Sequence, residues 1–314
     1  MKLLFTSVGR RVELIQAFRN AADGIGVDLQ IVGADISDTA PALHFCDIKI
    51  RTPRIDDTNY IPFLVQYCND NNIDALIPTI DTDLHLLSLN KDRFNKTKVV
   101  ISAPDKIALC RDKRLTGIFF EQCGLCFPTP VDDVIKYGQG FPAFIKPKDG
   151  SSSINAYKVN NAEELKTLAE MVPDYIIQPF IEGLEYTVDA FCDFEGNPIL
   201  ITPRIRLAVR SGEVLKTEID NDEIIIDEMR KLINNFKPCG AITVQLIRDK
   251  NTGKDYFIEI NPRFGGGAPL SIKAGANSAE ILLRLINGDR FDYIANAAEN
   301  HVIFSRYDQS IRIN

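Results

Sequence analysis

The first hundred residues alternate between short apolar runs and segments of helical periodicity, and this alternation restricts the fold more than any other feature. Strands that alternate with helices form a parallel sheet with helices on both faces. Ligands bind such sheets at the carboxyl ends of the strands. The expected strands are 2–6, 29–34, 75–78 and 98–101, and the expected helices are 10–22 and 60–69.

Polar turns follow three of these strands, at 7–10, 35–37 and 79–83. The first holds Gly9 alone rather than G-x-G-x-x-G, so a dinucleotide site is not expected. Asp35 is interpreted as a turn or helix cap rather than a ribose ligand.

From residue 104 onwards the pattern changes to strands with hairpin-like turns, which predicts an α+β part with antiparallel sheets. Asn161 followed by Glu164 predicts a capping box at the start of a helix. A further helix is expected at 112–123, and strands are expected at 141–147, 175–179, 185–192, 199–205, 241–248 and 256–260.

The stretch YFIEINPRFGGG, residues 256–267, interrupts an apolar strand with polar side chains. Glu259 and Asn261 share one strand face, opposite Tyr256, Ile258 and Ile260, because alternate side chains share a face. If the preceding hairpin folds symmetrically about Thr252, Gln245 lies opposite Glu259. Oxygen ligands of this kind suit Mg²⁺, with water and phosphate completing the shell. The alternative is a solvated sheet face.

Several basic and glycine-rich features suit an anion. Arg263 can contact phosphate oxygens, and Gly265, Gly266 and Gly267 let backbone amides approach an anion. Lys146 lies in an apolar strand, where a lysine is rarely buried without an anionic partner. The remaining candidates are Lys113 on a helix, a flap-like loop of Gly150, Ser151, Ser152 and Ser153, Glu185 as a ribose ligand, and Arg204 and Arg206 with Arg210 as carboxylate anchors. For the arginines the alternative is an exposed edge strand, and for Lys113 and Glu185 it is an ordinary surface position.

Composition excludes several classes of protein. The net charge of -7 argues against broad nucleic-acid binding, and no apolar run is long enough to span a bilayer. The start MKLLFTSVGRR has only a short apolar piece and does not fit a signal peptide. The seven cysteines are expected to be reduced, and the lone Cys123-x-x-Cys126 has no second pair to form a metal site. A cytoplasmic location is expected.

These motifs, in this order, resemble the ATP-grasp superfamily, and they are most similar to the short carbamoyl phosphate synthase large-chain-like carboxylate–amine ligases. The resemblance implies a fold of mixed α/β and α+β class, with a Rossmann-like pre-ATP-grasp domain before a two-part ATP-grasp fold. It divides the chain into a pre-ATP-grasp domain at 1–103, a small lid-bearing subdomain at 104–180 and a large subdomain at 181–314.

The resemblance also implies roles for the residues named above. Gln245, Glu259 and Asn261 would bind magnesium, two ions in all with Mn²⁺ as an alternative, and Arg263 would steady the transferring phosphate, with Arg204 and Arg206 nearby. The nucleotide ATP would be held by Lys113, Lys146, the flap at Gly150, Ser151, Ser152 and Ser153, an adenine hinge at Gln178, Pro179, Phe180 and Ile181, and Glu185.

The implied reaction begins with attack of a substrate carboxylate on the γ-phosphate of ATP. The resulting acyl phosphate then reacts with an amine to form an amide. No amidotransferase region or second synthetase half is present, which argues against carbamoyl phosphate synthesis itself. Bicarbonate or carbamate activation and a non-catalytic ATP-binding module are the alternatives. The expected partners are small-molecule carboxylates and amines, with a homodimer left open and neither nucleic acid nor membrane.

The second substrate must lie near Arg263 and the glycines, in line with the γ-phosphate. The turn at 7–10 offers Arg10 and a helix amino terminus to an anion. The turn at 79–83 offers Asp81 and Asp83 to an amine. Together they predict an amino acid or similar small zwitterion, whereas the alternative is that both turns are solvated loops with capping roles.

Overall fold

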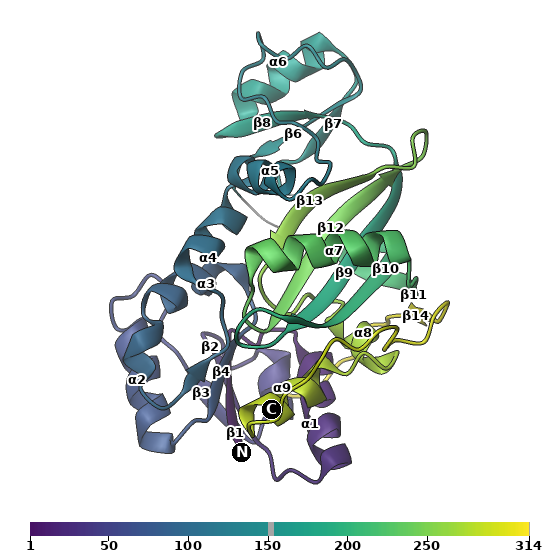
Figure 1. The fold of residues 1–314 in the computed structure, drawn as a ribbon. Coiled ribbons are helices and arrows are strands. Elements are labelled where there is room, and N and C mark those ends of the chain that lie inside the picture. The colour runs from purple at the N-terminus through teal and green to yellow at the C-terminus, as the bar shows by residue number, and fades with distance from the viewer. Residues whose placement is uncertain (150–153, 314) are drawn as a thin grey trace.

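A computed structural model describes residues 1–149 and 154–313, and the chain is organised around three sheets (Figure 1). The amino-terminal sheet is parallel, with the order β3-β2-β1-β4-β5. Its strands are β1 (Lys2–Thr6), β2 (Gln30–Asp35), β3 (Ile48–Arg51), β4 (Ala75–Pro78) and β5 (Lys98–Val99). The helices around it are α1 (Val12–Ile25), α2 (Tyr60–Asn71), α3 (Asp81–Leu89) and α4 (Pro104–Arg111), with 3-10 turns η1 (Pro41–Phe45) and η2 (Lys91–Phe94).

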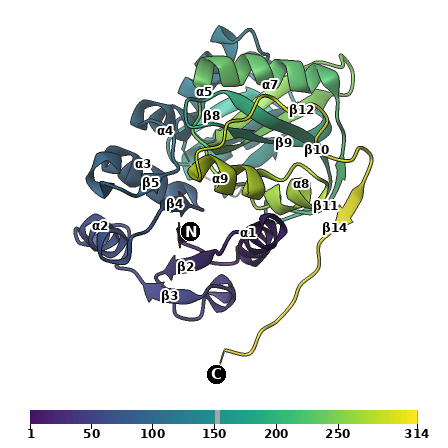
Figure 2. The ribbon, with the colours of Figure 1, turned by 60° about the horizontal axis from the view of Figure 1, so that its bottom comes forward.

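Both faces of this sheet are buried, as the sequence predicted. Leu3 and Phe5 of β1 pack into one core with α1, whereas Leu4 packs into a second core with α2. The first core also contains residues of α8 (Ala268–Lys273) and α9 (Ser278–Ile286). Helix α1 accordingly lies beside α8 and α9 (Figure 2), which joins the amino-terminal sheet to the last third of the chain.

The segment 79–83, expected to be a turn, is the start of helix α3. Asp81 and Asp83 lie in its first helical turn, after Ile80 in an extended conformation. Carboxylates are favourable there because they face the unpaired amides of the helix amino terminus. The turn prediction is therefore wrong from Asp81 onwards.

The middle of the chain forms an antiparallel sheet with the order β7-β6-β8. Its elements are β6 (Ala143–Pro147), β7 (Tyr157–Val159) and β8 (Tyr175–Pro179), accompanied by α5 (Lys113–Gln122) and α6 (Ala162–Met171). Asn161 caps α6 by accepting from the amides of Glu163 and Glu164, as predicted. The Glu164 carboxylate accepts from the amide of Asn160 rather than from that of Asn161, so the capping box is displaced by one residue.

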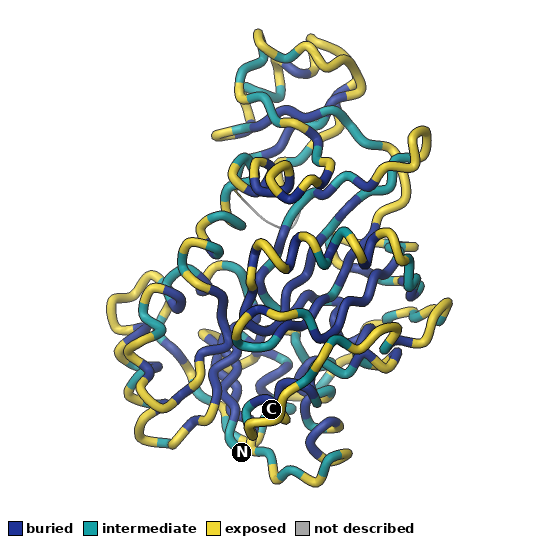
Figure 3. The backbone as a smooth tube through the Cα atoms, in the orientation of Figure 1, coloured by how far each residue is buried: buried dark blue, intermediate teal, exposed yellow. Residues whose placement is uncertain are grey.

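The largest sheet is antiparallel, with the order β13-β12-β9-β10-β11-β14. Helix α7 (Glu223–Phe236) covers one face through Ile225, Met229 and Phe236 (Figure 1). Buried residues follow the strands of the sheets, and exposed ones follow the loops and outer helix faces (Figure 3). The strands are β9 (Gly183–Cys192), β10 (Pro198–Arg210), β11 (Glu213–Ile219), β12 (Ala241–Asp249), β13 (Asp255–Asn261) and β14 (Ile303–Ser305).

A β-bulge interrupts the pairing of β12 with β13. Gln245 pairs with Glu259, but Leu246 pairs with Phe257, so Ile258 is an extra residue. A bulge of this kind breaks the alternation of faces. Phe257 and Ile260 are buried while Tyr256 is not, so the prediction that Tyr256, Ile258 and Ile260 share the apolar face is wrong.

In the part of the chain that the structure describes, no helix has the length and apolarity needed to cross a bilayer.

Candidate active site

The three predicted metal ligands lie together near the carboxyl end of β13. Gln245 is directly opposite Glu259, and the Asn261 side-chain amide donates to Glu259 Oε1 at 2.9 Å. All three side chains are partly exposed, so they remain accessible to an ion. No group of three or more His, Cys, Asp or Glu residues suited to a metal occurs within residues 1–149 and 154–313. A cation here would have one carboxylate and two amides, a set that fits Mg²⁺ completed by phosphate and water.

Two lysines from the middle of the chain face this cluster. Lys146 on β6 is only 7% exposed, and burial together with the neighbouring Lys113 lowers its pKa to about 8, opposed by the charge of Glu259. Burial also lowers the pKa of Lys113, against the carboxylates of Glu259 and Asp149. The amide of Lys113 donates to the carbonyl of Lys148 at 3.0 Å, which fixes the start of α5 to the end of β6. The structure thus brings Lys146 from β6 and Lys113 from the start of α5 to Glu259.

The predicted adenine hinge, Gln178 to Ile181, ends β8 and continues beyond it. The Gln178 side-chain amide is buried and donates to the carbonyl of Pro128, so this side chain is engaged within the protein. The amide of Phe180 donates to the carbonyl of Pro142 at 3.1 Å, and the Lys158 ammonium lies 4.3 Å from the Phe180 ring centroid. Pro179 and Ile181 complete the segment, whose hinge role stays a prediction. The predicted flap at Gly150, Ser151, Ser152 and Ser153 lies outside the described residues.

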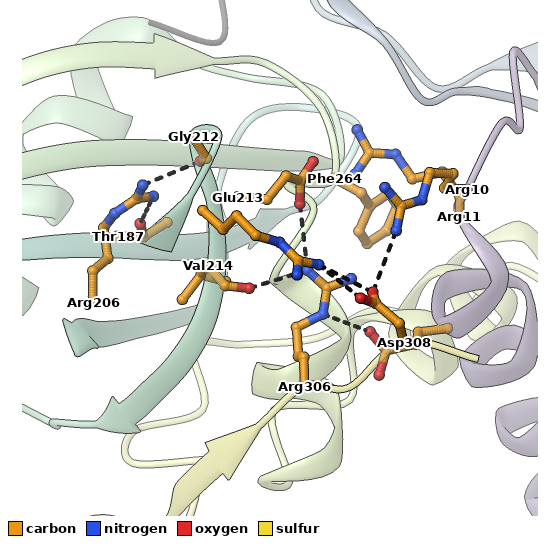
Figure 4. Close-up of polar contacts among 12 residues, drawn as sticks. Arg10, Arg11, Thr187, Arg206, Gly212, Glu213, Val214, Phe264, Arg306 and Asp308 are labelled. Carbon is orange, nitrogen blue, oxygen red and sulfur yellow. Dashed lines mark hydrogen bonds and ion pairs between the residues drawn. The ribbon is translucent and has the colours of Figure 1, made fainter. Parts of the chain in front are cut away.

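Glu185, the predicted ribose ligand, is exposed at the beginning of β9 and forms an ion pair with Arg206 at 3.2 Å. Arg206 also donates to the Thr187 hydroxyl and the Gly212 carbonyl, each at 3.2 Å (Figure 4). These contacts fix the position of Arg206, which pairs with Glu185 through one carboxylate oxygen. Its ribose role stays a prediction.

Arg204 and Arg206 are not exposed arginines of an edge strand, because β10 lies between β9 and β11. Arg204 is 1% exposed and donates through Nε to Asp189 Oδ2 at 2.8 Å, while Arg206 is 9% exposed. Only Arg210 reaches the surface, where it pairs with Asp308 at 2.9 Å. The interpretation of an exposed edge is therefore wrong for the first two, and their catalytic role stays a prediction.

The glycines after Arg263 are packed against charged side chains. A Cβ on Gly266 would lie 2.5 Å from Glu213 Oε2 and 3.0 Å from Arg11 Nη1. A Cβ on Gly267 would lie 2.7 Å from Arg204 Nη2, and one on Gly265 would lie 2.6 Å from the Thr243 hydroxyl. A side chain at any of these positions would force the neighbouring groups to move, so the glycines allow the backbone to lie against them.

Arg263 pairs with Asp81 across the two sheets. Its Nε donates to Asp81 Oδ1 at 2.8 Å and its Nη2 donates to Oδ2. Arg11 lies beside this pair and donates through Nη2 to the Thr79 carbonyl at 3.2 Å. Burial and the charge of Arg263 lower the pKa of Arg11, while Glu213 and Asp81 oppose this shift. Two guanidinium groups and two carboxylates therefore meet at one point, which we call the charged junction (Arg11, Asp81, Glu213 and Arg263).

The sequence pattern pointed to Arg10 as the anion ligand and did not single out its neighbour Arg11. The Arg10 side chain is 84% exposed and lies 3.7 Å from Asp308 (Figure 4). The carboxy-terminal segment also contributes Arg306, which donates to Glu13 at 3.0 Å and to Glu213 at 3.3 Å. No motif in the sequence distinguishes these residues, because their positions depend on contacts between distant segments.

Asp83 lies in the core beneath the charged junction. Its Oδ2 accepts from Thr6 at 2.9 Å, from Tyr60 at 3.2 Å and from Ser7 at 3.2 Å, and the residue is fully buried. Burial raises the pKa of Asp83 to about 6. The structure corrects the assignment of Asp83 to a substrate amine, because an amine in solution cannot reach this carboxylate.

Two family models match the chain. A PylC-like N-terminal domain matches residues 3–102, and an ATP-grasp domain matches residues 110–267, half of the 314-residue chain. The chain belongs to the ATP-grasp family. The resemblance inferred from the sequence is confirmed, and so is the mixed α/β fold with a separate domain before the ATP-grasp domain. The domain boundaries at residues 103 and 180 stay predictions.

Known ATP-grasp proteins resemble this chain in sequence and fold. The 3-methyl-D-ornithine–L-lysine ligase of Methanosarcina mazei is 25% identical over 224 residues, which are 69% of this chain and 56% of that protein. This chain therefore spans little more than half the length of that ligase. The L-amino acid ligase of Bacillus licheniformis has a TM-score of 0.71 at 18% identity, covering 90% of this chain and 73% of the other.

A biotin carboxylase domain shares the same fold. The domain of Hydrogenobacter thermophilus 2-oxoglutarate carboxylase, solved as a dimer with MgADP, ADP and bicarbonate, has a TM-score of 0.75 at 18% identity. The match covers 96% of this chain and 73% of that chain. At this identity the likeness supports the fold and leaves the substrates to the chemistry of the site.

Proposed function

We propose that this ATP-grasp protein is a ligase that activates a carboxylate as an acyl phosphate and joins it to an amine, with release of ADP and phosphate. One observation carries the proposal. Lys113 at the start of α5 and the buried Lys146 of β6 both lie within reach of the charge of Glu259, although Asp149 also acts on Lys113. Two lysines that are largely withdrawn from water and lie next to the metal ligands fit the phosphates of a nucleotide.

The metal ligands suit the same nucleotide. Gln245, Glu259 and Asn261 would hold Mg²⁺, two ions in all with Mn²⁺ as an alternative, and bound magnesium would offset the negative charge on the phosphates. Lys113 and Lys146 neutralise further phosphate charge from the opposite side. The protein then has little covalent chemistry to perform, because positioning and charge neutralisation account for most of phosphoryl transfer.

The charged junction is the proposed position of the second substrate. Arg11 presents a guanidinium group to a carboxylate beside Arg263, and Glu213 presents a carboxylate to an amine. This combination fits a small zwitterion, such as an amino acid, that supplies one of the reacting groups. Arg204 lies behind Gly267 and supports the loop that lines this position.

ADP release from MgATP, measured with and without mixed pools of carboxylates and amines, tests the proposal. Release that requires both pools is the expected result. Release with bicarbonate alone would indicate a carbamoyl phosphate synthase-like reaction instead. Binding of MgATP without turnover in any pool would indicate a regulatory module, and failure to bind MgATP would overturn the proposal.

A further inference from the structure

Asp81 and Arg263 form the ion pair that connects the amino-terminal sheet to the candidate active site. The two residues are 182 positions apart in the sequence, and their side chains are 32% and 13% exposed. Asp81 begins α3, whereas Arg263 follows β13. The contact is a two-point contact, because Nε and Nη2 each donate to a different carboxylate oxygen.

The hydrogen bonds of Arg263 leave a defined part of its guanidinium available. Arginine has five N–H donors in a fixed plane. Asp81 accepts from Nε and Nη2, and the Phe264 carbonyl accepts from Nη1 at 3.1 Å. Three of the five donors are thus engaged within the described residues, which leaves one N–H on Nη1 and one on Nη2. Both remain able to donate to oxygens of a bound anion.

We propose that Asp81 is a positioning residue for Arg263, which it holds with its two remaining N–H groups directed at the terminal phosphate of bound ATP. This inference rests on the proposed function. Arg11 supports it, because this second guanidinium lies close enough to Arg263 for the two charges to repel, and the carboxylate of Asp81 offsets that repulsion. The amino-terminal domain thereby acts on phosphoryl transfer through an arginine that follows β13.

The sequence suggested a different role for Asp81, namely binding of a substrate ammonium group. Both oxygens of Asp81 already accept from Arg263, and Arg11 lies close by. Two neighbouring guanidinium groups make this carboxylate a poor site for another cation. The two roles are distinguishable, because loss of an ammonium ligand raises the KM for the amine. Loss of the positioning contact lowers the affinity for the terminal phosphate and reduces kcat.

Calorimetric titration with MgADP and with the non-hydrolysable ATP analogue MgAMPPNP separates the terminal phosphate from the rest of the nucleotide. In Asp81→Asn we expect the affinity for MgAMPPNP to fall about tenfold, the size expected when a charge-assisted hydrogen bond weakens. Unchanged MgADP affinity would show that the fold and the nucleotide site are intact. In Arg263→Ala the same loss is expected, and the double variant should lose no more than Arg263→Ala alone.

Two further variants complete the experiment. Arg263→Lys keeps the charge but cannot form the two-point contact. Its affinity for MgAMPPNP relative to MgADP should therefore also fall. Lys273→Ala breaks the 2.8 Å pair with Glu13, another contact between the two parts of the chain, and should leave both affinities unchanged. If Asp81→Asn or Arg263→Lys kept the wild-type ratio of MgAMPPNP affinity to MgADP affinity, the inference would be overturned. Failure of the wild-type protein to bind MgADP would overturn the proposed function and this inference with it.

Discussion

Gln245 on β12 lies directly opposite Glu259 on β13, one residue before the bulge that shifts the rest of the hairpin. This pairing places an amide and a carboxylate side by side, and Asn261 adds a hydrogen bond of 2.9 Å to Glu259. Because Lys113 and Lys146 approach the same carboxylate, Glu259 is the group on which metal binding and nucleotide binding converge.

The first prediction concerns Glu259. Glu259→Gln removes the only carboxylate of the proposed metal site while preserving its shape, so we expect turnover to be abolished and the free energy of unfolding to change little. ADP release and urea denaturation measure the two effects. Glu182→Gln, which alters an exposed ion pair with Lys250, is the matched control and should retain turnover. Near-normal turnover in Glu259→Gln would contradict the metal assignment.

The second prediction concerns Lys146. Lys146→Ala should weaken MgATP binding by roughly 1.5–3 kcal/mol, because it removes a charge-assisted contact to phosphate. The wild-type affinity should also decline as the pH rises above about 8, since the free protein then loses the ammonium charge that the phosphates require. Lys146→Arg should abolish this decline. Calorimetry at several pH values would contradict the assignment if the wild-type affinity were constant or if Lys146→Ala bound MgATP normally.

The sequence predicted the fold well where local periodicity determines it. The parallel strands of the first hundred residues and the pairing of Gln245 with Glu259 depend on short-range patterns and on a turn. The position of Lys146 was also predictable, because a lysine within an apolar strand needs an anionic partner. These features explain why the family could be recognised before the structure was known.

The features that the sequence did not predict depend on distant contacts. Arg204 could not be placed in the interior without the order of the strands, which puts β10 between two neighbours. The bulge at Ile258 was not predictable because Phe257 is buried in a core that distant segments build, where it packs against Phe120 of α5. The burial of Asp83 requires Tyr60 from another helix. Each of these positions is fixed by residues that are remote in the sequence.

The third prediction uses the buried carboxylate of Asp83. Its pKa in the folded protein is raised to about 6, above the value near 3.9 expected for an unfolded chain. Between these values the folded state binds more protons than the unfolded state, so this group makes the protein less stable as the pH rises from about 4 to about 6. Over this pH range the group should lower the free energy of unfolding by on the order of 3 kcal/mol.

Asp83→Asn should remove this pH dependence, although the variant itself will be less stable because an amide is a weaker acceptor for the three hydroxyl groups. Urea denaturation at pH 4, 5 and 6 measures how steeply the free energy of unfolding changes with pH in the wild type and in the variant. The exposed Asp57→Asn should retain the wild-type slope. An identical slope in Asp83→Asn would show that the carboxylate is not the titrating group.

The last prediction distinguishes two adjacent arginines at the start of α1. Arg11 donates to the Thr79 carbonyl and lies beside Arg263, whereas Arg10 is 84% exposed and contacts only the exposed Asp308 among the charged groups of the described residues. A guanidinium withdrawn from water binds a carboxylate more strongly than one at the surface, where solvent and salt screen its charge. Arg11→Ala should therefore raise the KM for the carboxylate substrate about tenfold or more.

Arg10→Ala is the matched variant, since it removes the same side chain one position earlier, and its KM should change less than about twofold. MgATP affinity should be unchanged in both, because neither arginine lies among the lysines that face Glu259. The KM is measured with the carboxylate substrate that the ADP-release screen identifies. If Arg10→Ala raised the KM as much as Arg11→Ala did, the assignment of Arg10 made from the sequence would hold. The substrate would then bind at the outer edge of the charged junction, where the carboxy-terminal segment carries Arg306 and Asp308.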